Sequence, residues 1–433
     1  MEEKHNEELI KIKFDEVAYI VEKGDSDQLR RILENGQFDD INERKDTRSG
    51  PTLLMIACKS GFIECVKVLL DNNVELNRGY EIGEILRCVC HSGSVEMVRF
   101  ITASGLRVCD EAIMSVFQTL NLIENTEIIT ILVQYIDNIN FYAYGTFVYW
   151  ASKDGNVVIV RALLERGADP NKIFYDYDDA LFVAAGQGHI NVIKLLLTWD
   201  TIDKPIWQER LVKVLKQASS RGHVDVVCFI VEYGIAVSGL TAALVSAVAH
   251  NQVEVVSYLI DHGADYNNAT IDEYTLLTYS CNKHYVDMVR LLLAHGVDMD
   301  AADYDGSFPL DFAIYYTDIL QLLLEAGADP NVRFCHGTTA LLNAVSSTDV
   351  VPGASLLLLQ HGADPNLADA ETDFTPLMAA ASAARVDLVR QLLEHGADVT
   401  QVNHAGQTVL DILGPGHSVI LELCMQYMKP VLK

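Results

Sequence analysis

The chain has 433 residues, of which 50% are hydrophobic and 21% are charged, a composition typical of folded and not of disordered proteins. Asp and Glu (60) outnumber Lys and Arg (32), so the formal net charge is −28. Such a charge opposes attraction to the phosphates of nucleic acids and to anionic membrane surfaces. We therefore expect neither nucleic acid nor a membrane as a partner.

The N-terminal sequence MEEKHNEELIKIKF lacks the apolar core that a signal peptide requires. No apolar stretch approaches the ~20 residues that cross a bilayer. The nine cysteines are sparse and odd in number, which argues against a disulfide scaffold. We expect reduced cysteines and a cytoplasmic location, with the nucleus as the alternative.

The first clear pair of elements lies at residues 49–70, SGPTLLMIACKSGFIECVKVLL. A threonine suits the N-cap of a short helix, and small residues within that helix allow close approach of the next one. The second helix has apolar residues at i, i+3, i+4 and i+7, which form one face. Related strings follow at 305–314, 373–393 and 405–413.

A tripeptide, Gly-Ala-Asp, recurs after the second helix of these pairs. From Gly263 onward the glycines are 33, 31, 35 and 34 residues apart. Glycine ends a helix cheaply in the left-handed conformation. The tripeptide begins at Gly167, Gly263, Gly327, Gly362 and Gly396, with Gly-Val-Asp at Gly296.

These strings resemble the ankyrin repeat, with its TPLHxAA opening and LLLxxGADxN close, and residues 369–403 match that pattern nearly throughout. The resemblance implies an all-α ankyrin-repeat solenoid, about 12–13 stacked helix pairs with projecting loop fingers. We expect an N-terminal extension at 1–13, the array at 14–428 and a tail at 429–433. The array is degenerate around 78–140, and residues 109–140 lack both turn glycines.

Such an array offers a long concave groove, and not the enclosed pocket that catalysis usually needs. The sequence contains no phosphate-binding loop, nucleophile elbow or HExxH motif. We therefore predict a non-catalytic scaffold or adaptor without a cofactor or metal, monomeric by itself, that binds a protein or peptide along the groove. The alternatives are a substrate-recognition subunit of a larger complex such as a ubiquitin ligase, and a microbial effector acting in a host cell.

Cysteine and histidine clusters are the candidates for other chemistry. Cys88, Cys90 and His91, with Cys109, could hold zinc, but small buried thiols in a helix are the stronger interpretation. Histidines precede four of the helix-closing glycines, and we expect them to bond the last free carbonyls of their helices. These four are His262, His295, His361 and His395.

Aromatic residues are dense between positions 141 and 182. Phe147, Trp150 and Phe182 fall on helices and suit packing, whereas four tyrosines fall in predicted fingers. Tyrosine is a favoured anchor at protein interfaces. Partner contact and packing between fingers both stay open for Tyr142, Tyr144, Tyr175 and Tyr177.

Basic residues are nearly absent between positions 291 and 384, where Arg333 stands against thirteen acidic residues. Aspartate caps turns and favours solubility, but no turn geometry requires the absence of lysine and arginine. We predict that a Lys/Arg-rich partner segment binds this stretch. The carboxylates proposed for contact are Asp300, Asp303, Asp305, Asp369, Glu371 and Asp373.

Overall fold

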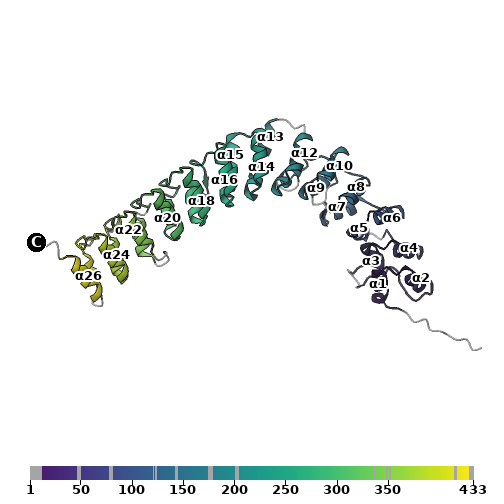
Figure 1. The fold of residues 1–433 in the computed structure, drawn as a ribbon, viewed down its shortest axis with the longest axis horizontal. Coiled ribbons are helices and arrows are strands. Elements are labelled where there is room, and N and C mark those ends of the chain that lie inside the picture. Colours follow the sequence, from purple (N-terminus) through teal and green to yellow (C-terminus); the bar gives the residue numbers. More distant parts are fainter. Residues whose placement is uncertain are drawn as a thin grey trace, which may run out of the picture. The chain divides into compact units, whose positions relative to one another are not determined.

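The structure is a computed structural model that describes residues 12–45, 50–77, 81–119, 121, 124–141, 145–173, 179–199, 204–335, 337–347, 350, 353–413 and 417–428. The chain divides into two compact units, Met1–Ile206 (unit 1) and Trp207–Lys433 (unit 2). Within each unit, helix pairs follow one another in chain order (Figure 1). This arrangement confirms the predicted helical solenoid.

Unit 1 contains six described helix pairs. The first helices of the pairs are α1 (Phe14–Glu22), α3 (Leu53–Ser60), α5 (Glu81–His91), α7 (Asp110–Thr119), α9 (Phe147–Lys153) and α11 (Ala180–Gly186). The second helices are α2 (Ser26–Glu34), α4 (Ile63–Asp71), α6 (Val95–Ala103), α8 (Thr126–Val133), α10 (Val157–Glu165) and α12 (Ile190–Trp199). A helix pair is thus present at 109–140, where the turn glycines are missing.

Unit 2 begins within α13 and contains seven described pairs. The first helices are α13 (Lys204–Arg221), α15 (Val237–Ala249), α17 (Leu276–Asn282), α19 (Pro309–Ala313), α21 (Ala340–Ser346), α23 (Pro376–Ser382) and α25 (Val409–Ile412). The second helices are α14 (Val224–Gly234), α16 (Val253–Asp261), α18 (Val286–Ala294), α20 (Thr317–Ala326), α22 (Ala354–Gln360), α24 (Val386–Glu394) and α26 (Ser418–Met428). Strands β1 (Thr270–Ile271) and β2 (Tyr274–Thr275) pair antiparallel in one finger.

Packing follows two parallel rows. First helices contact first helices of neighbouring pairs, as in α3 with α5, and second helices contact second helices, as in α18 with α20. The apolar residues between the rows are buried, including Leu53 and Phe147 at 0% exposure. Each pair therefore buries its core only against adjacent pairs, as expected for a repeat protein.

The predicted helix ends are present. The Thr52 hydroxyl accepts a hydrogen bond from the Met55 amide at 3.3 Å, and Thr375 does the same for Met378 at 3.2 Å. Gly327 ends α20 with φ of 99°. The histidine prediction is confirmed, because each imidazole Nδ1 lies 2.8–2.9 Å from the carbonyl oxygen four residues earlier, in His262, His295, His361 and His395.

A ladder of asparagines joins successive pairs. Asn366 donates from Nδ2 to the Gly396 carbonyl at 3.1 Å and accepts at Oδ1 from the Asp398 amide at 2.7 Å. Both contacts recur one period apart. Equivalent pairs of bonds are made by Asn77, Asn140 and Asn331. We call this set the asparagine ladder; each member joins two consecutive helix pairs.

Candidate protein-binding surface

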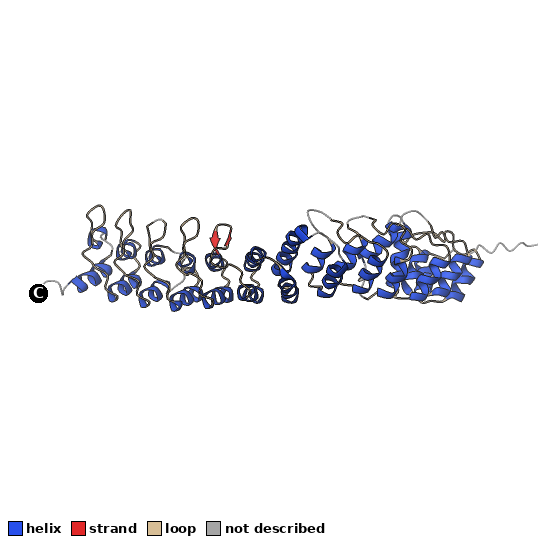
Figure 2. Cartoon of the chain, turned by 90° about the horizontal axis from the view of Figure 1, so that it is seen from above, coloured by secondary structure: helices blue, strands red, loops and turns tan. Residues whose placement is uncertain are grey.

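The fingers of unit 2 form a connected row, which we call the finger row: residues 270–275, 303–307, 369–374 and 403–407, with the described part of 334–338. They project from the same side of the helix layers (Figure 2). Backbone bonds join the fingers in two groups: Tyr304 N to Glu273 O at 3.2 Å in the first, and Ala370 N to Gly337 O at 3.2 Å with His404 N to Thr372 O at 2.9 Å in the second. The stacked rings of Phe308 and Phe334, with centroids 6.2 Å apart, connect the two groups within unit 2.

Two of the predicted carboxylates close their own fingers. Asp303 Oδ1 accepts from the amides of Asp305 at 3.1 Å and Ser307 at 2.8 Å, and its other oxygen is buried. Asp369 Oδ1 accepts from the amides of Glu371 at 2.8 Å and Thr372 at 2.9 Å. Both side chains therefore shape their finger tips through Oδ1.

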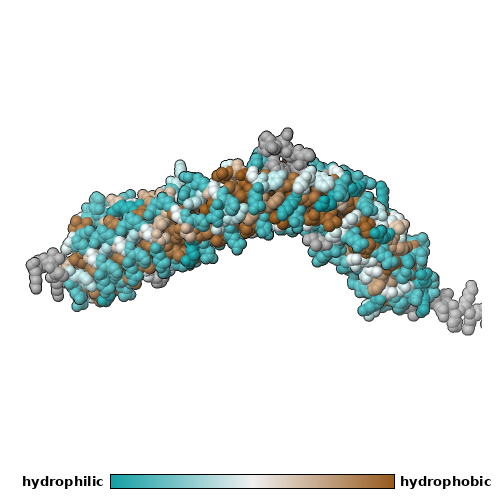
Figure 3. Space-filling model, turned by 45° about the horizontal axis from the view of Figure 1, so that its top comes forward, coloured by the Kyte–Doolittle hydropathy of each residue, from teal (hydrophilic) through white to brown (hydrophobic). Residues whose placement is uncertain are grey.

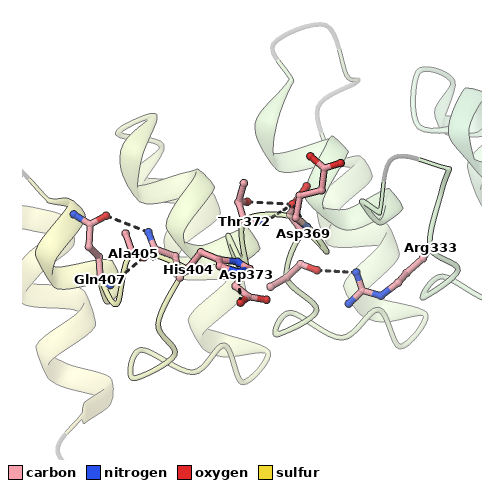
Figure 4. A network of polar contacts seen from close by, with 10 residues as sticks. Arg333, Asp369, Thr372, Asp373, His404, Ala405 and Gln407 are labelled. Atoms are coloured by element: carbon pink, nitrogen blue, oxygen red, sulfur yellow. Dashed lines mark hydrogen bonds and ion pairs between the residues drawn. The ribbon is translucent and has the colours of Figure 1, made fainter.

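Arg333 reaches toward the second of these fingers. Its Nη1 donates to the carbonyls of Gly337 and Ala368, both at 2.8 Å (Figure 4). Desolvation by itself would raise the pKa of Asp369, but the amide and hydroxyl hydrogen bonds and the Arg333 charge outweigh it, so the pKa is lowered. The one basic residue of the acidic stretch is thus committed to holding neighbouring fingers together.

Asp300 occupies a ladder position. It aligns with Asn366 in the repeat, and its Oδ1 accepts from the Asp329 amide at 3.3 Å. Desolvation raises the pKa of Asp300, the Asp329 amide opposes the rise, and the charges of Asp329 and Asp298 add to it. This carboxylate takes part in the joint between two helix pairs.

The other three predicted carboxylates are exposed at the finger tips. Among the described residues, the side chains of Asp305 and Glu371 make no hydrogen bond or ion pair. Asp373 has a left-handed backbone (φ 52°) and places Oδ2 3.3 Å from His404 Nδ1. The structure thus separates the six predicted residues into three that hold the fold and three that face solvent.

Tyr304 is a residue that the sequence analysis missed. Its side chain is 83% exposed at a finger tip, between Asp303 and Asp305. An aromatic ring in an Asp-Tyr-Asp-Gly turn has no core position to occupy, and this signal could have identified it. Exposed tyrosine beside a carboxylate suits contact with a lysine or arginine.

The four predicted finger tyrosines, Tyr142, Tyr144, Tyr175 and Tyr177, lie outside the described residues. Their role in partner contact stays a prediction. Of the helical aromatics nearby, Phe147 is buried and packs edge-to-face on Phe117, with ring centroids 5.1 Å apart.

The Cys88–His91 segment lies on α5. Cys90 is buried, and burial raises its pKa to about 12, whereas a zinc-binding thiol must lose its proton. The described residues hold no group of three or more His, Cys, Asp or Glu side chains placed to bind a metal ion. Cys90 therefore lies in the core as a protonated thiol, whereas Cys88 is half-buried.

The surface of unit 2 seen in Figure 3 is mostly hydrophilic toward the C-terminus, with apolar side chains scattered between. None of the helices in the described ranges combines the length and apolarity needed to cross a membrane.

Acid should weaken unit 2 through Asp369. A lowered folded-state pKa means that this carboxylate stabilises the fold above its unfolded pKa of about 3.9, and that the contribution is lost as the pH falls through the folded value. Asp369→Asn can keep the turn, as Asn403 does in its own finger. We expect its free energy of unfolding to fall less between about pH 5 and 3 than that of the native chain. Urea unfolding at several pH values measures this, with Asp305→Asn as the control; identical pH profiles for Asp369→Asn and the native chain would contradict the assignment.

Comparison with known proteins agrees with this architecture. A family model described as ankyrin repeats (three copies) matches residues 17–112, 120–208, 181–270, 244–334 and 332–403. Among solved structures, the ankyrin repeat domain of Bcl-3, a member of the IkappaB protein family, is 27% identical, with a TM-score of 0.43 over 48% of this chain and 97% of that chain.

Three curated relatives illustrate the range of similar proteins. The chain is 33% identical over 141 residues to the ankyrin repeat protein nuc-2 of Neurospora crassa, covering 31% of this chain and 13% of that protein. It is 40% identical over 74 residues to protein phosphatase 1 regulatory subunit 27 of Mus musculus (17% and 47% covered). It is 28% identical over 216 residues to ankyrin repeat and SOCS box protein 6 of Homo sapiens (44% and 48%). In each case the chain spans less than half of the relative.

Proposed function

Because this chain belongs to the ankyrin-repeat family, whose repeats generally mediate protein–protein interaction, we propose that it is a non-catalytic scaffold or adaptor. Its finger row in unit 2 binds a Lys/Arg-rich segment of a partner protein. The protein acts in the cytosol or nucleus. All nine of its cysteines are free thiols, which fits a reducing compartment.

The observation that carries this proposal is the outward placement of unpaired carboxylates. Asp305 and Glu371 project as exposed residues from two fingers of the row, with the 334–338 finger between them in the chain. Arg333, the basic residue of the same stretch, already binds two carbonyls. The remaining negative charge is available to a cationic partner, since no described residue neutralises Asp305 or Glu371.

Tyr304 adds an aromatic contact to the charged ones. A cation over an exposed tyrosine ring gains about 0.5–1 kcal/mol, and the ring lies beside Asp305 in sequence. Charge at the rim of an interface acts mostly on the encounter rate. The finger row therefore favours rapid, salt-sensitive association over tight burial.

The test uses a fluorescent peptide of alternating lysine and serine, with association followed by stopped-flow at about 0.01 M and 0.15 M salt, where the Debye lengths are about 30 and 8 Å. Neutralising Asp305, Glu371 and Asp373 together (to Asn or Gln) should slow association at low salt by about tenfold and flatten the salt dependence. The three residues that hold the fold, Asp300, Asp303 and Asp369, stay unchanged.

The matched control removes the same charge from second-row helices of unit 2, through Asp387→Asn, Glu394→Gln and Glu422→Gln, all exposed positions. It should keep most of the native rate. Equal loss in the two variants would mean that the peptide senses only the net charge of the chain, and the finger row would not be the binding surface.

A second candidate is a recognition or regulatory subunit of an enzyme complex. Two relatives favour it by name, one a regulatory subunit of protein phosphatase 1 and the other a SOCS box protein. The two candidates differ in the partner: a subunit of an enzyme complex binds a catalytic subunit, whereas a scaffold binds proteins that are not enzymes. Co-purification of a catalytic subunit with the full chain would favour this candidate over a scaffold for non-enzymes.

A further inference from the structure

Unit 1 has a groove of its own along its first-row helices. It is a hollow of about 830 Å³ among α1, α3, α5 and α7. Met55 and Ile56 of α3 and Cys88 of α5 form its floor, and Lys59 and Arg87 stand beside them. The volume is enough for several side chains of an extended peptide.

Some of the carboxylates around this groove are held in ion pairs, whereas Glu22, which also lines it, has no cation within ion-pair distance among the described residues. Arg44 lies 3.1 Å from Glu81 and 2.7 Å from Glu84, and Lys45 lies 3.4 Å from Asp15. Arg44 and Lys45, at one edge of the groove, are therefore already engaged in ion pairs within unit 1. Because one guanidinium pairs with two carboxylates, these contacts offset only part of the negative charge of Glu81 and Glu84.

Lys59 and Arg87 are different, because neither has a carboxylate within ion-pair distance among the described residues. Lys59 is exposed and Arg87 is half-buried. A partly desolvated guanidinium without an anion is unfavourable, and it is unexpected in a chain with a net charge of −28. The position of Arg87 therefore favours an anionic partner.

The two cations line the same hollow as Cys88, although they come from neighbouring helices, α3 and α5. Burial raises the pKa of the Cys88 thiol, the charges of Lys59 and Arg87 oppose that rise, and the charge of Glu84 adds to it. A single carboxylate-bearing segment could contact both.

We infer that this groove binds an acidic segment of a partner protein, with partner carboxylates placed on Lys59 and Arg87 and the backbone of the segment over Met55 and Cys88. The inference extends the proposed interaction function to a second surface of opposite charge. It does not depend on the finger row, because the residues belong to unit 1 and select the opposite kind of peptide.

The experiment uses the full chain and a fluorescent peptide of alternating glutamate and serine, with binding measured by anisotropy at low salt. We expect Lys59→Gln with Arg87→Gln to weaken binding by at least about tenfold. The control, Arg30→Gln with Arg99→Gln, removes equal charge from exposed positions on α2 and α6 and should change binding by no more than about twofold. Circular dichroism establishes that both variants are folded.

A second readout needs no variant. Alkylation of Cys88 by iodoacetamide, followed by mass spectrometry, should slow when the glutamate peptide is added to the native chain, while exposed Cys335 reacts at an unchanged rate. The lysine–serine peptide should not protect Cys88. Its binding should also survive Lys59→Gln with Arg87→Gln, which separates a failure here from a failure of the finger row.

Three results would overturn the inference. One is equal weakening in the groove and control variants, and another is alkylation of Cys88 that the glutamate peptide leaves unchanged. The third is self-association of the native chain, seen by analytical ultracentrifugation and lost in the groove variant, because a second copy would then be the occupant.

Discussion

Replacing Phe147 by alanine is expected to lower the free energy of unfolding of unit 1 by about 3–5 kcal/mol, the usual cost of truncating a buried phenylalanine. Phe147 of α9 is 0% exposed and Phe117 of α7 is 1% exposed, and their rings meet edge-to-face at 73°. Each helix pair is stable only through its neighbours. The substitution therefore opens the joint between the degenerate repeat at 109–140 and the next one.

Urea unfolding measures this loss, and hydrogen exchange locates it. Faster exchange should be confined to α7, α9 and their nearest neighbours, because coupling in a repeat array falls off with distance. The control is Tyr135→Ala, at a position 44% exposed, with an expected change below about 1 kcal/mol. A loss below that figure for Phe147→Ala would show that this joint is not a packed core.

Replacing Arg44 by methionine should cost about 3 kcal/mol, since removing one partner of a buried ion pair leaves the other charge uncompensated. Arg44 and Glu81 have side chains only 11% and 7% exposed, and the guanidinium also donates to the Gly50 carbonyl at 3.0 Å. Glu81 stands in the first turn of α5, where the helix dipole favours an anion. Because the dipole still stabilises the Glu81 carboxylate when Arg44 is gone, we expect a loss of stability at the low end of the range for buried ion pairs.

A double-mutant cycle with Glu81→Leu isolates the pair. The double variant should recover a large part of the stability lost in Arg44→Met, because no charge is then left buried. The free energies of unfolding of the four proteins give the coupling. Additive losses from the two single substitutions would mean that Arg44 stabilises unit 1 through contacts other than the one with Glu81.

The sequence predicted the helical array because its signals are local. The Gly-Ala-Asp period marks the end of each second helix, and threonine marks the start of the first. The histidines next to those glycines bond carbonyls of their own helices, within reach of four residues. Such features need no knowledge of the tertiary contacts.

The separation of the acidic residues could not be predicted in the same way. Asp303 and Asp305 have the same side chain and lie two residues apart, yet one is bent back onto backbone amides and the other faces solvent. Asp300 could have been recognised, because it aligns with the ladder asparagines. The others depend on finger geometry that a count of charges does not contain.

The groove of unit 1 escaped the sequence analysis for a related reason. Lys59 and Arg87 are ordinary helix residues of neighbouring repeats, and Arg87 is left without a carboxylate partner among the described residues while Glu81 and Glu84 pair with Arg44. Pairing between neighbouring repeats therefore decides which charges remain available. The net charge of a stretch of sequence does not show which of its charged residues are paired.

The most direct test of the central claim, that the finger row contacts a basic protein segment, is photo-crosslinking from position 304. A benzophenone amino acid replaces Tyr304 in the full chain, and partner peptides captured from a cell extract are identified by mass spectrometry; the control carries it at exposed Val419 of α26. We predict adducts at position 304 with Lys/Arg-rich segments, reduced by high salt and by neutralising Asp305, Glu371 and Asp373. Adducts no more abundant than at Val419, or segments without an excess of basic residues, would contradict the claim.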